Sequence, residues 1–182
     1  LFVLMAGLVS QSDIAEKSFA AATKWLNWMP GALGASTIAS ATLFSSISGS
    51  SPATTAAVGY TAIPEMLRNG YNGRLSAGVV VAGGTLGVLI PPSVVMIIFG
   101  IVTETSIGQL FIAGIIPGLL LSFMLTMHVV IYSKIYPPEG GRLRSVSWSD
   151  RFGSLTGVWP VVLLFAAIIG AIYTGIATAT EA

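Results

Sequence analysis

The sequence predicts an all-α, multi-pass membrane protein organised around a re-entrant helical hairpin and a discontinuous transmembrane helix. The first observation is composition: 54% of the 182 residues are hydrophobic and 8% are charged, whereas soluble domains carry about 25% charged residues. The second is an uncharged run over residues 75–103 that is interrupted by glycines and a Pro-Pro pair. The third is another uncharged stretch, over residues 32–64, with a serine-rich centre.

The run over residues 75–103 is long enough to cross a bilayer, since about 20 apolar residues suffice. Pro91 and Pro92 lack backbone N–H groups, and Pro92 disfavours the helical conformation in the residue before it. Within lipid, backbone groups that a break leaves unpaired are costly unless protein, water or an ion partners them. We therefore predict that residues 67–104 form a discontinuous transmembrane helix, which is a feature of transporters.

Residues 31–66 predict the re-entrant hairpin. Five serines, one glycine and one proline fall within residues 45–52. The apolar arms on either side have about a dozen residues each, too few to cross about 30 Å of hydrocarbon at about 1.5 Å per residue. One arm would descend to mid-membrane, the polar tip would turn, and the other arm would return. The alternative is one kinked helix whose serines bond to their own carbonyls.

The remaining segments read as helices and one long loop. Residues 10–30 predict an amphipathic arm helix in the membrane–water interface, which lysine and tryptophan favour; a cytosolic core helix is the alternative. Because the chain starts within an apolar segment, we expect a piece of a larger membrane protein. The other expected segments are the end of a transmembrane helix over 1–9, a transmembrane helix over 105–133, a cytoplasmic basic loop over 134–151, and a transmembrane helix within 152–182.

The basic residues give the expected orientation. Arg68 and Arg74 flank one short loop, and Lys134, Arg142, Arg144 and Arg151 lie in the longer one. Cytoplasmic loops are enriched in lysine and arginine, so we expect both loops on the cytoplasmic side.

Several function classes are disfavoured. The chain has no cysteine and one histidine, so no metal-ligand set or Ser/His/Asp set can be assembled, and we expect no enzymatic activity. The scattered basic residues indicate no nucleic-acid partner. Proton coupling would be expected to use an intramembrane Asp, Glu or His. His128 is the one candidate, and its place near the end of a span favours an interfacial side chain.

Two polar breaks are expected at similar membrane depth, over residues 48–55 and 83–93. Both offer backbone carbonyls and hydroxyl groups, the latter from Ser48, Ser50, Ser51, Thr54, Thr85 and Ser93. Neutral oxygens suit a monovalent hard cation such as Na⁺, whereas Ca²⁺ sites usually recruit carboxylates. The second hairpin arm begins near Pro52, where a helix N-terminus could receive a carboxylate substrate.

These two stretches also carry a family resemblance. SGSSPAT at 48–54 and GGTLGVLIPPS at 83–93 together resemble the large membrane subunit of tripartite ATP-independent periplasmic (TRAP) transporters, of the DctM type. The similarity continues through IPEM at 63–66, Gly70-Tyr71 and SIGQLFIAGIIPG at 106–118. It reaches TATEA at 178–182, where Ala179 replaces a proline usual in the family, and so covers essentially the whole chain.

The resemblance implies an elevator-type, Na⁺-driven fold with two inverted repeats. This chain would hold most of the first repeat and the start of the second, leaving out the second hairpin and broken helix. Carried over by motif, the Na⁺ site would be formed by Ser48, Gly49, Ser50, Ser51, Gly84, Thr85 and Gly87. Residues proximal to the substrate would be Thr54, Pro91, Pro92 and Ser93.

The resemblance also implies the partners. Such a subunit pairs with a small membrane subunit and receives an organic acid, such as a C4-dicarboxylate or sialic acid, from a periplasmic substrate-binding protein. We therefore expect Na⁺-coupled uptake of an organic anion across a bacterial inner membrane, amid membrane lipid and with no cofactor besides the coupling ion. The alternatives are an ion channel whose re-entrant loop is a selectivity filter, and a related re-entrant-loop transporter that works without a binding protein.

Overall fold

The computed structural model describes residues 14–137 and 147–173, and every regular element among them is a helix. The all-α prediction is confirmed for this part of the chain. The expectations for residues 1–9 and for the chain beyond residue 173 lie outside the described residues. The helices are α2 (Ile14–Leu26), α3 (Ala32–Ser48), α4 (Ser51–Arg68), α5 (Gly73–Gly84), α6 (Leu86–Leu89), α7 (Val94–Val102), α8 (Ile107–Ile135), α9 (Trp148–Leu155) and α10 (Trp159–Tyr173).

The run over residues 75–103 does not form one straight helix. α5 ends at Gly84, α6 supplies one further turn, and the chain then leaves the helical conformation at Ile90 before α7 begins. The Pro91–Pro92 peptide bond in this non-helical segment is cis. Taken together, Gly73–Val102 is long and apolar enough to cross a membrane, and so is Ile107–Ile135. The glycines and prolines thus interrupt the helix where the sequence indicates.

α3 and α4 are joined by a turn of two residues, Gly49 and Ser50. Gly49 adopts the left-handed conformation, with φ of 57°, and its N–H donates to the Ser45 carbonyl at 3.1 Å, which closes the end of α3. The Ser50 side chain then accepts from the Ala53 N–H at 3.5 Å and caps the start of α4. Short polar side chains are the usual caps at this position, so the serine-rich centre is where the chain reverses.

α8 packs along α3 and then along the interruption. At the α3 end, Gly34 lies against the Val129 side chain, and Thr42 shares a hydrogen bond with Ser122 at 2.7 Å. At the interruption, Gly118 lies against Ile90. Small residues of this kind let helices approach closely, as they do in membrane proteins. α8 therefore supports the hairpin and the interruption together. The helix runs unbroken through Pro117.

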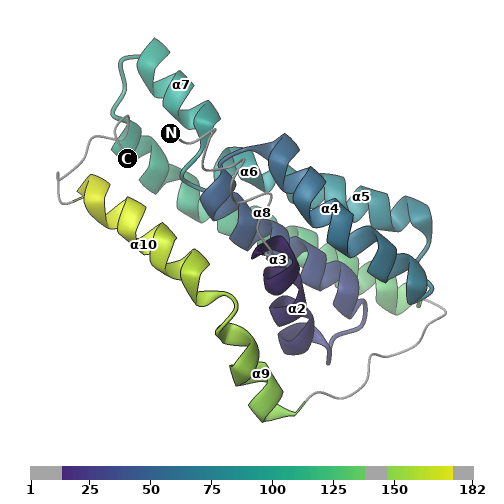
Figure 1. Ribbon diagram of the computed structural model, residues 1–182. Helices are drawn as coiled ribbons and strands as arrows, with labels where there is room; N and C mark the ends of the chain where they lie inside the picture. Colours follow the sequence, from purple (N-terminus) through teal and green to yellow (C-terminus); the bar gives the residue numbers. More distant parts are fainter. Residues whose placement is uncertain (1–13, 138–146, 174–182) are drawn as a thin grey trace.

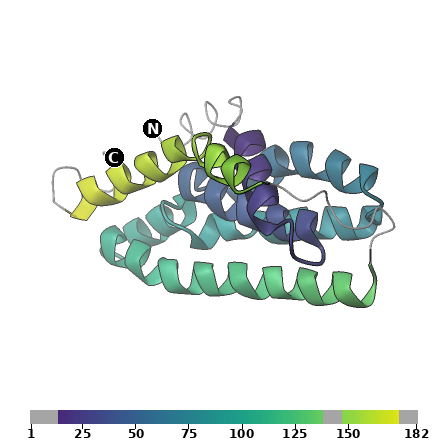
Figure 2. The same cartoon turned by 90° about the horizontal axis from the view of Figure 1, so that it is seen from below.

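The two views of the structure show where the helices begin and end along the bundle. The turn between α4 and α5 and the end of α8 lie at one end of the molecule, and the turn between α7 and α8 lies at the other (Figure 1, Figure 2). Gly31, just before α3, lies against Ser133 near the end of α8. Both outer ends of the α3–α4 pair are thus at the same end of the bundle. How this bundle sits in a membrane stays a prediction.

α7 and α8 expose large apolar side chains instead of burying them. Val102 and Ile116 are each 76% exposed, and Phe123 is 61% exposed. So many exposed large apolar side chains on two helices are unusual on a soluble monomer and indicate a surface that meets another apolar phase or a partner. One buried cluster lies where α2 packs on α3 and α4 through Phe19, Phe44 and Met66. A second includes Ile38 of α3, Leu86 of α6 and Val129 on the inner side of α8.

We expected a loop over 134–151 and a transmembrane helix starting within 152–182, but the structure places the boundary differently. Helix α9 crosses that boundary, a turn follows at residues 156–158, and α10 begins only at Trp159. The reason lies in contacts with α2. The Arg151 guanidinium donates to Asn27 Oδ1 at 3.0 Å, and the Trp25 indole N–H donates to the Arg151 carbonyl at 3.2 Å. These long-range contacts hold α9 beside α2 and are not visible in the local pattern.

Tyr71, in the turn before α5, reaches the first turn of α3. It is 7% exposed, and its hydroxyl oxygen faces the backbone N–H groups of Leu33 and Gly34. The residue before α3, Gly31, offers no side-chain cap. Burial raises the pKa of Tyr71, and the two backbone hydrogen bonds partly offset that rise. Tyr71 thus satisfies donors that a helix start would otherwise leave unpaired.

We expect Tyr71→Phe to lower the free energy of unfolding by about 1–3 kcal/mol, because it leaves buried N–H groups unpaired. Thermal melting of the purified full-length protein measures this, with the exposed Tyr136→Phe as control. The stabilisation that the neutral Tyr71 hydroxyl gives is fully present below the ordinary tyrosine pKa of 10.0. It is lost as the pH rises through the raised pKa that Tyr71 has in the folded protein. The difference in melting temperature between Tyr71→Phe and wild type should therefore narrow as the pH rises above 10.0. Equal melting of Tyr71→Phe and wild type would contradict this role.

Candidate functional site

The tip of the α3–α4 hairpin lies directly against the interruption between α5 and α7. We call this contact the junction; it comprises Ser48, Gly49, Ser50 and Ser51 from the tip and Gly84, Gly87, Pro92 and Ser93 from the interruption. The Val94 N–H donates to the Gly49 carbonyl at 3.2 Å. A Cβ at Gly49 would lie 2.5 Å from the Pro92 carbonyl oxygen. Two breaks far apart in sequence therefore meet, backbone against backbone.

The α5–α6 side of the junction is equally close. A Cβ at Gly87 would lie 2.8 Å from the Ser51 nitrogen and 2.9 Å from the Ser50 carbonyl carbon. Those neighbours are backbone atoms, which cannot rotate away as a side chain can. Gly84, one turn earlier, is buried beside the Thr55 side chain. The first turn of α4 thus packs against two glycines, Gly84 and Gly87.

A network of hydroxyl groups supports the tip from inside. Thr54 Oγ1 shares hydrogen bonds with Ser48 Oγ at 2.9 Å and with Ser45 Oγ at 3.4 Å. All three side chains are completely buried. Ser48 Oγ also accepts from the Ser50 N–H at 3.5 Å. These bonds tie the last turn of α3 to the first turn of α4 and fix the shape of the tip.

Two buried hydroxyl groups at the junction have no partner among the described residues, Ser51 Oγ and Ser93 Oγ. Ser51 is the first residue of α4, and Ser93 immediately precedes α7. A buried polar group without a hydrogen bond costs about 1–3 kcal/mol. Native proteins keep few such groups, and each one calls for a partner such as water, an ion or a ligand.

Four helix ends converge on the junction, and they differ in polarity. α3 and α5 end there, presenting backbone carbonyls, whereas α4 and α7 begin there, presenting backbone N–H groups. Helix C-termini favour cations and helix N-termini favour anions. No junction residue carries a titratable side chain, and the described residues contain no group of three His, Cys, Asp or Glu that could hold a metal ion. The junction therefore offers neutral oxygen ligands beside anion-favouring helix starts.

The structure brings most of the predicted site residues together. Beside the junction residues themselves, Thr54 lies in the hydroxyl network and Pro91 is buried in the interruption. Thr85 stands apart, because its side chain is exposed and its hydroxyl donates to the Ala82 carbonyl, within its own helix, at 2.7 Å. The role of these residues in binding Na⁺ or substrate stays a prediction.

Three residues that the sequence did not single out also shape the site. Thr55 packs against Gly84, and Ser45 extends the hydroxyl network. Gly114 of α8 lies against the Leu89 carbonyl, where a Cβ would be 2.6 Å from the oxygen. Gly114 and Gly118 are four residues apart, a spacing of small residues that marks close helix packing in membranes. That spacing is the signal that could have identified α8 as a support of the interruption.

The fold and the junction define a class, a helical membrane protein in which a hairpin tip meets an interrupted helix. Residues 1–182 match the family model described as tripartite ATP-independent periplasmic transporter, DctM component. The chain therefore belongs to the large-permease family of TRAP transporters, as the resemblance of its two motifs indicated.

Individual relatives agree over the full chain. It is 39% identical over 182 residues to the C4-dicarboxylate TRAP transporter large permease protein DctM of Pseudomonas aeruginosa. It is 35% identical over 181 residues to the protein of the same name from Vibrio cholerae. It is 39% identical over 185 residues to the ectoine TRAP transporter large permease protein TeaC of Halomonas elongata. All of this chain is covered in each case, but only 40–42% of each relative.

Gly87→Ala should disrupt the junction, because its methyl group would meet two backbone atoms of the tip. Gly78→Ala is the matched control, since nothing lies within 4 Å of a Cβ there. In the purified full-length protein we expect Gly87→Ala to melt at a clearly lower temperature. Gly78→Ala should melt at or above the wild-type temperature, because alanine favours a helix over glycine by about 1 kcal/mol. Identical melting of the two variants would argue against the contact.

Proposed function

We propose that this chain forms part of the large permease subunit of a TRAP transporter that takes up a small organic acid with Na⁺ as the coupling ion. The junction is the observation that carries the proposal, because it combines neutral oxygen ligands with anion-favouring helix starts in one buried place. The relatives are named for a C4-dicarboxylate and for ectoine, so the proposal names a class of substrate and no single compound.

Na⁺ would bind on the side of the junction where α3 and α5 end. Carbonyl oxygens at those ends, with the hydroxyls of Ser51 and Ser93, supply ligands without negative charge. Such a set suits a monovalent hard cation, whereas divalent calcium usually recruits carboxylates. A bound ion would also partner the two hydroxyl oxygens that are buried without hydrogen bonds. The Thr85 hydroxyl donates its hydrogen to the Ala82 carbonyl, so it would contribute to the Na⁺ site through a lone pair on its oxygen.

The substrate carboxylate would bind near the starts of α4 and α7. Backbone N–H groups in the first turn of each helix and the positive end of each helix dipole favour an anion there. Thr54, Pro91 and Pro92 would line this side, and Ser93 would lie between the substrate and the Na⁺. The other wall of the substrate site would come from the part of the subunit that this chain does not cover.

The proposed transport step is a movement of the hairpin and the interrupted helix as one body against a scaffold that includes α2. Their shared backbone contacts keep the junction intact during such a movement. A small membrane subunit would complete the scaffold, and a periplasmic substrate-binding protein would deliver the organic acid. The proposed location is a bacterial inner membrane, with the turn between α4 and α5 facing the cytoplasm.

Uptake into proteoliposomes tests the proposal. The full-length subunit, its small membrane subunit and the binding protein are reconstituted, and uptake of a labelled C4-dicarboxylate, sialic acid or ectoine is measured. We expect accumulation above the external concentration only when an inward Na⁺ gradient is imposed. Accumulation without Na⁺ would overturn the coupling. Equilibration without accumulation would instead indicate a channel.

Ser51→Ala and Ser93→Ala should each raise the Na⁺ concentration that gives half-maximal uptake. Losing one oxygen ligand worth about 1.4 kcal/mol corresponds to about a tenfold rise. Ser46→Ala is the matched control, because Ser46 lies close to the tip but its hydroxyl donates to the Leu43 carbonyl at 2.7 Å. Half-maximal Na⁺ is measured in the same vesicles. An unchanged value for both site variants, with normal melting, would remove these hydroxyls from the Na⁺ site.

A further inference from the structure

A second candidate site lies outside the junction, in a groove between α2 and α4. We call it the α2–α4 groove and define it by its charged residues, Glu16, Lys24, Glu65 and Arg68, and its apolar ones, Phe19 and Ile63. Its volume is about 830 Å³. Two helices with apolar faces thus leave a space between them whose lining carries both signs of charge.

The charges along the groove balance. α2 contributes Glu16 and Lys24, and α4 contributes Glu65 and Arg68, so each helix supplies one carboxylate and one cation. A lining of this kind does not favour a simple anion or a simple cation. It favours a ligand that itself carries one charge of each sign, because every ligand charge then finds an opposite charge on the wall.

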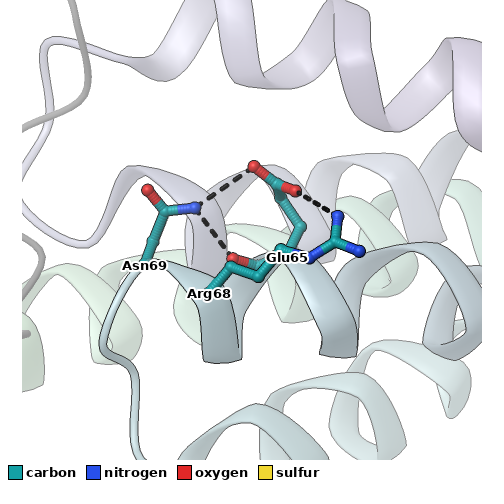
Figure 3. A network of polar contacts seen from close by, with 3 residues as sticks. All are labelled: Glu65, Arg68 and Asn69. Carbon is teal, nitrogen blue, oxygen red and sulfur yellow. Dashed lines mark hydrogen bonds and ion pairs between the residues drawn. The ribbon is translucent and has the colours of Figure 1, made fainter.

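The α4 side is partly organised in advance (Figure 3). The Asn69 amide donates to Glu65 Oε1 at 3.1 Å and to the Glu65 carbonyl at 2.9 Å, which orients the carboxylate. The ion pair between Arg68 and Glu65 is long, at 3.8 Å, and their side chains are 77% and 43% exposed. Exposed pairs of this sort contribute about 0–1 kcal/mol, so a ligand could engage both groups at little cost.

Pro64 leaves a backbone carbonyl of α4 without its usual helical donor. Proline has no N–H, so the carbonyl four residues earlier, that of Tyr60, lacks its usual helical donor. Tyr60 and Pro64 both line the groove. A ligand with several N–H donors could therefore bond to a carboxylate and to this carbonyl at once.

We propose that the α2–α4 groove binds the headgroup of a zwitterionic aminophospholipid, phosphatidylethanolamine in kind. Its primary ammonium would bond to Glu16, Glu65 and the Tyr60 carbonyl, and its phosphate would face Lys24 and Arg68. The acyl chains would follow the apolar walls into the bilayer. A primary ammonium has three N–H donors, as a lysine side chain does, whereas a quaternary choline has none, so the groove should distinguish the two lipids.

Lipid retention by the purified full-length transporter complex tests this site. The delipidated complex is given an equal mixture of phosphatidylethanolamine, phosphatidylglycerol and phosphatidylcholine with identical acyl chains, and bound lipid is counted by native mass spectrometry. We expect at least a fivefold preference for phosphatidylethanolamine. Removing the cations with Lys24→Met and Arg68→Met, or the carboxylates with Glu16→Gln and Glu65→Gln, should abolish that preference.

Two further variants separate lipid binding from folding. Ala20→Trp fills the groove from an exposed position on α2 and leaves its charges in place, and it should lower retention to the same extent. Lys134→Met with Glu104→Gln removes one charge of each sign outside the groove and should leave retention unchanged. Free phosphoethanolamine, the soluble headgroup, should not displace the lipid.

Three outcomes would overturn the proposal. Equal retention of the three lipids by the wild type would remove the selectivity. Wild-type retention by the groove variants would place the lipid elsewhere, as it would if the rest of the subunit fills the groove. Displacement by free phosphoethanolamine would show a soluble ligand site instead. The measurement is independent of transport, so it stands or falls separately from Na⁺ coupling.

Discussion

The requirement that an interrupted helix find partners for its backbone governs this structure. A helix that stops in apolar surroundings leaves N–H and C=O groups that lipid cannot satisfy. Here the Val94 N–H, at the start of α7, bonds to the Gly49 carbonyl of the hairpin tip. The tip is itself a helix reversal with the same difficulty. This one hydrogen bond thus partners a backbone group from each of the two breaks.

That solution determines which residues the tip and the interruption can contain. Backbone can approach backbone only where no side chain intervenes, so Gly49 and Gly87 occupy the points of closest contact. The Ser48 hydroxyl accepts from the Ser50 N–H in the turn and also bonds to the Thr54 hydroxyl. At the junction, the hydroxyls of Ser51 and Ser93 are buried and have no hydrogen-bond partner in the described part of the chain. Both hydroxyls lie where a ligand is proposed to bind.

The turn and the interruption could be predicted from the residues that form them, whereas the helices that pack around them could not. The serine, glycine and proline content of residues 45–52 and the Pro91-Pro92 pair mark the turn and the interruption, because these residues act through their own backbone. The position of α9 beside α2 depends on contacts between distant residues, and the support from α8 is indicated only by the spacing of Gly114 and Gly118. The exposure of the Thr85 side chain likewise follows from how its helix is packed, which spacing alone does not reveal.

The length of α8 has a consequence of its own. Its 29 residues extend about 43 Å at about 1.5 Å per residue, which exceeds the bilayer's hydrocarbon thickness of about 30 Å. If α8 spans the membrane as predicted, a helix that long would tilt or extend into the headgroup region, and its tilt would respond to bilayer thickness. Because α8 packs on both α3 and the interruption, a change in tilt would act on the hairpin and the break together. A mismatch between the length of α8 and the bilayer thickness would thus change the packing at the junction.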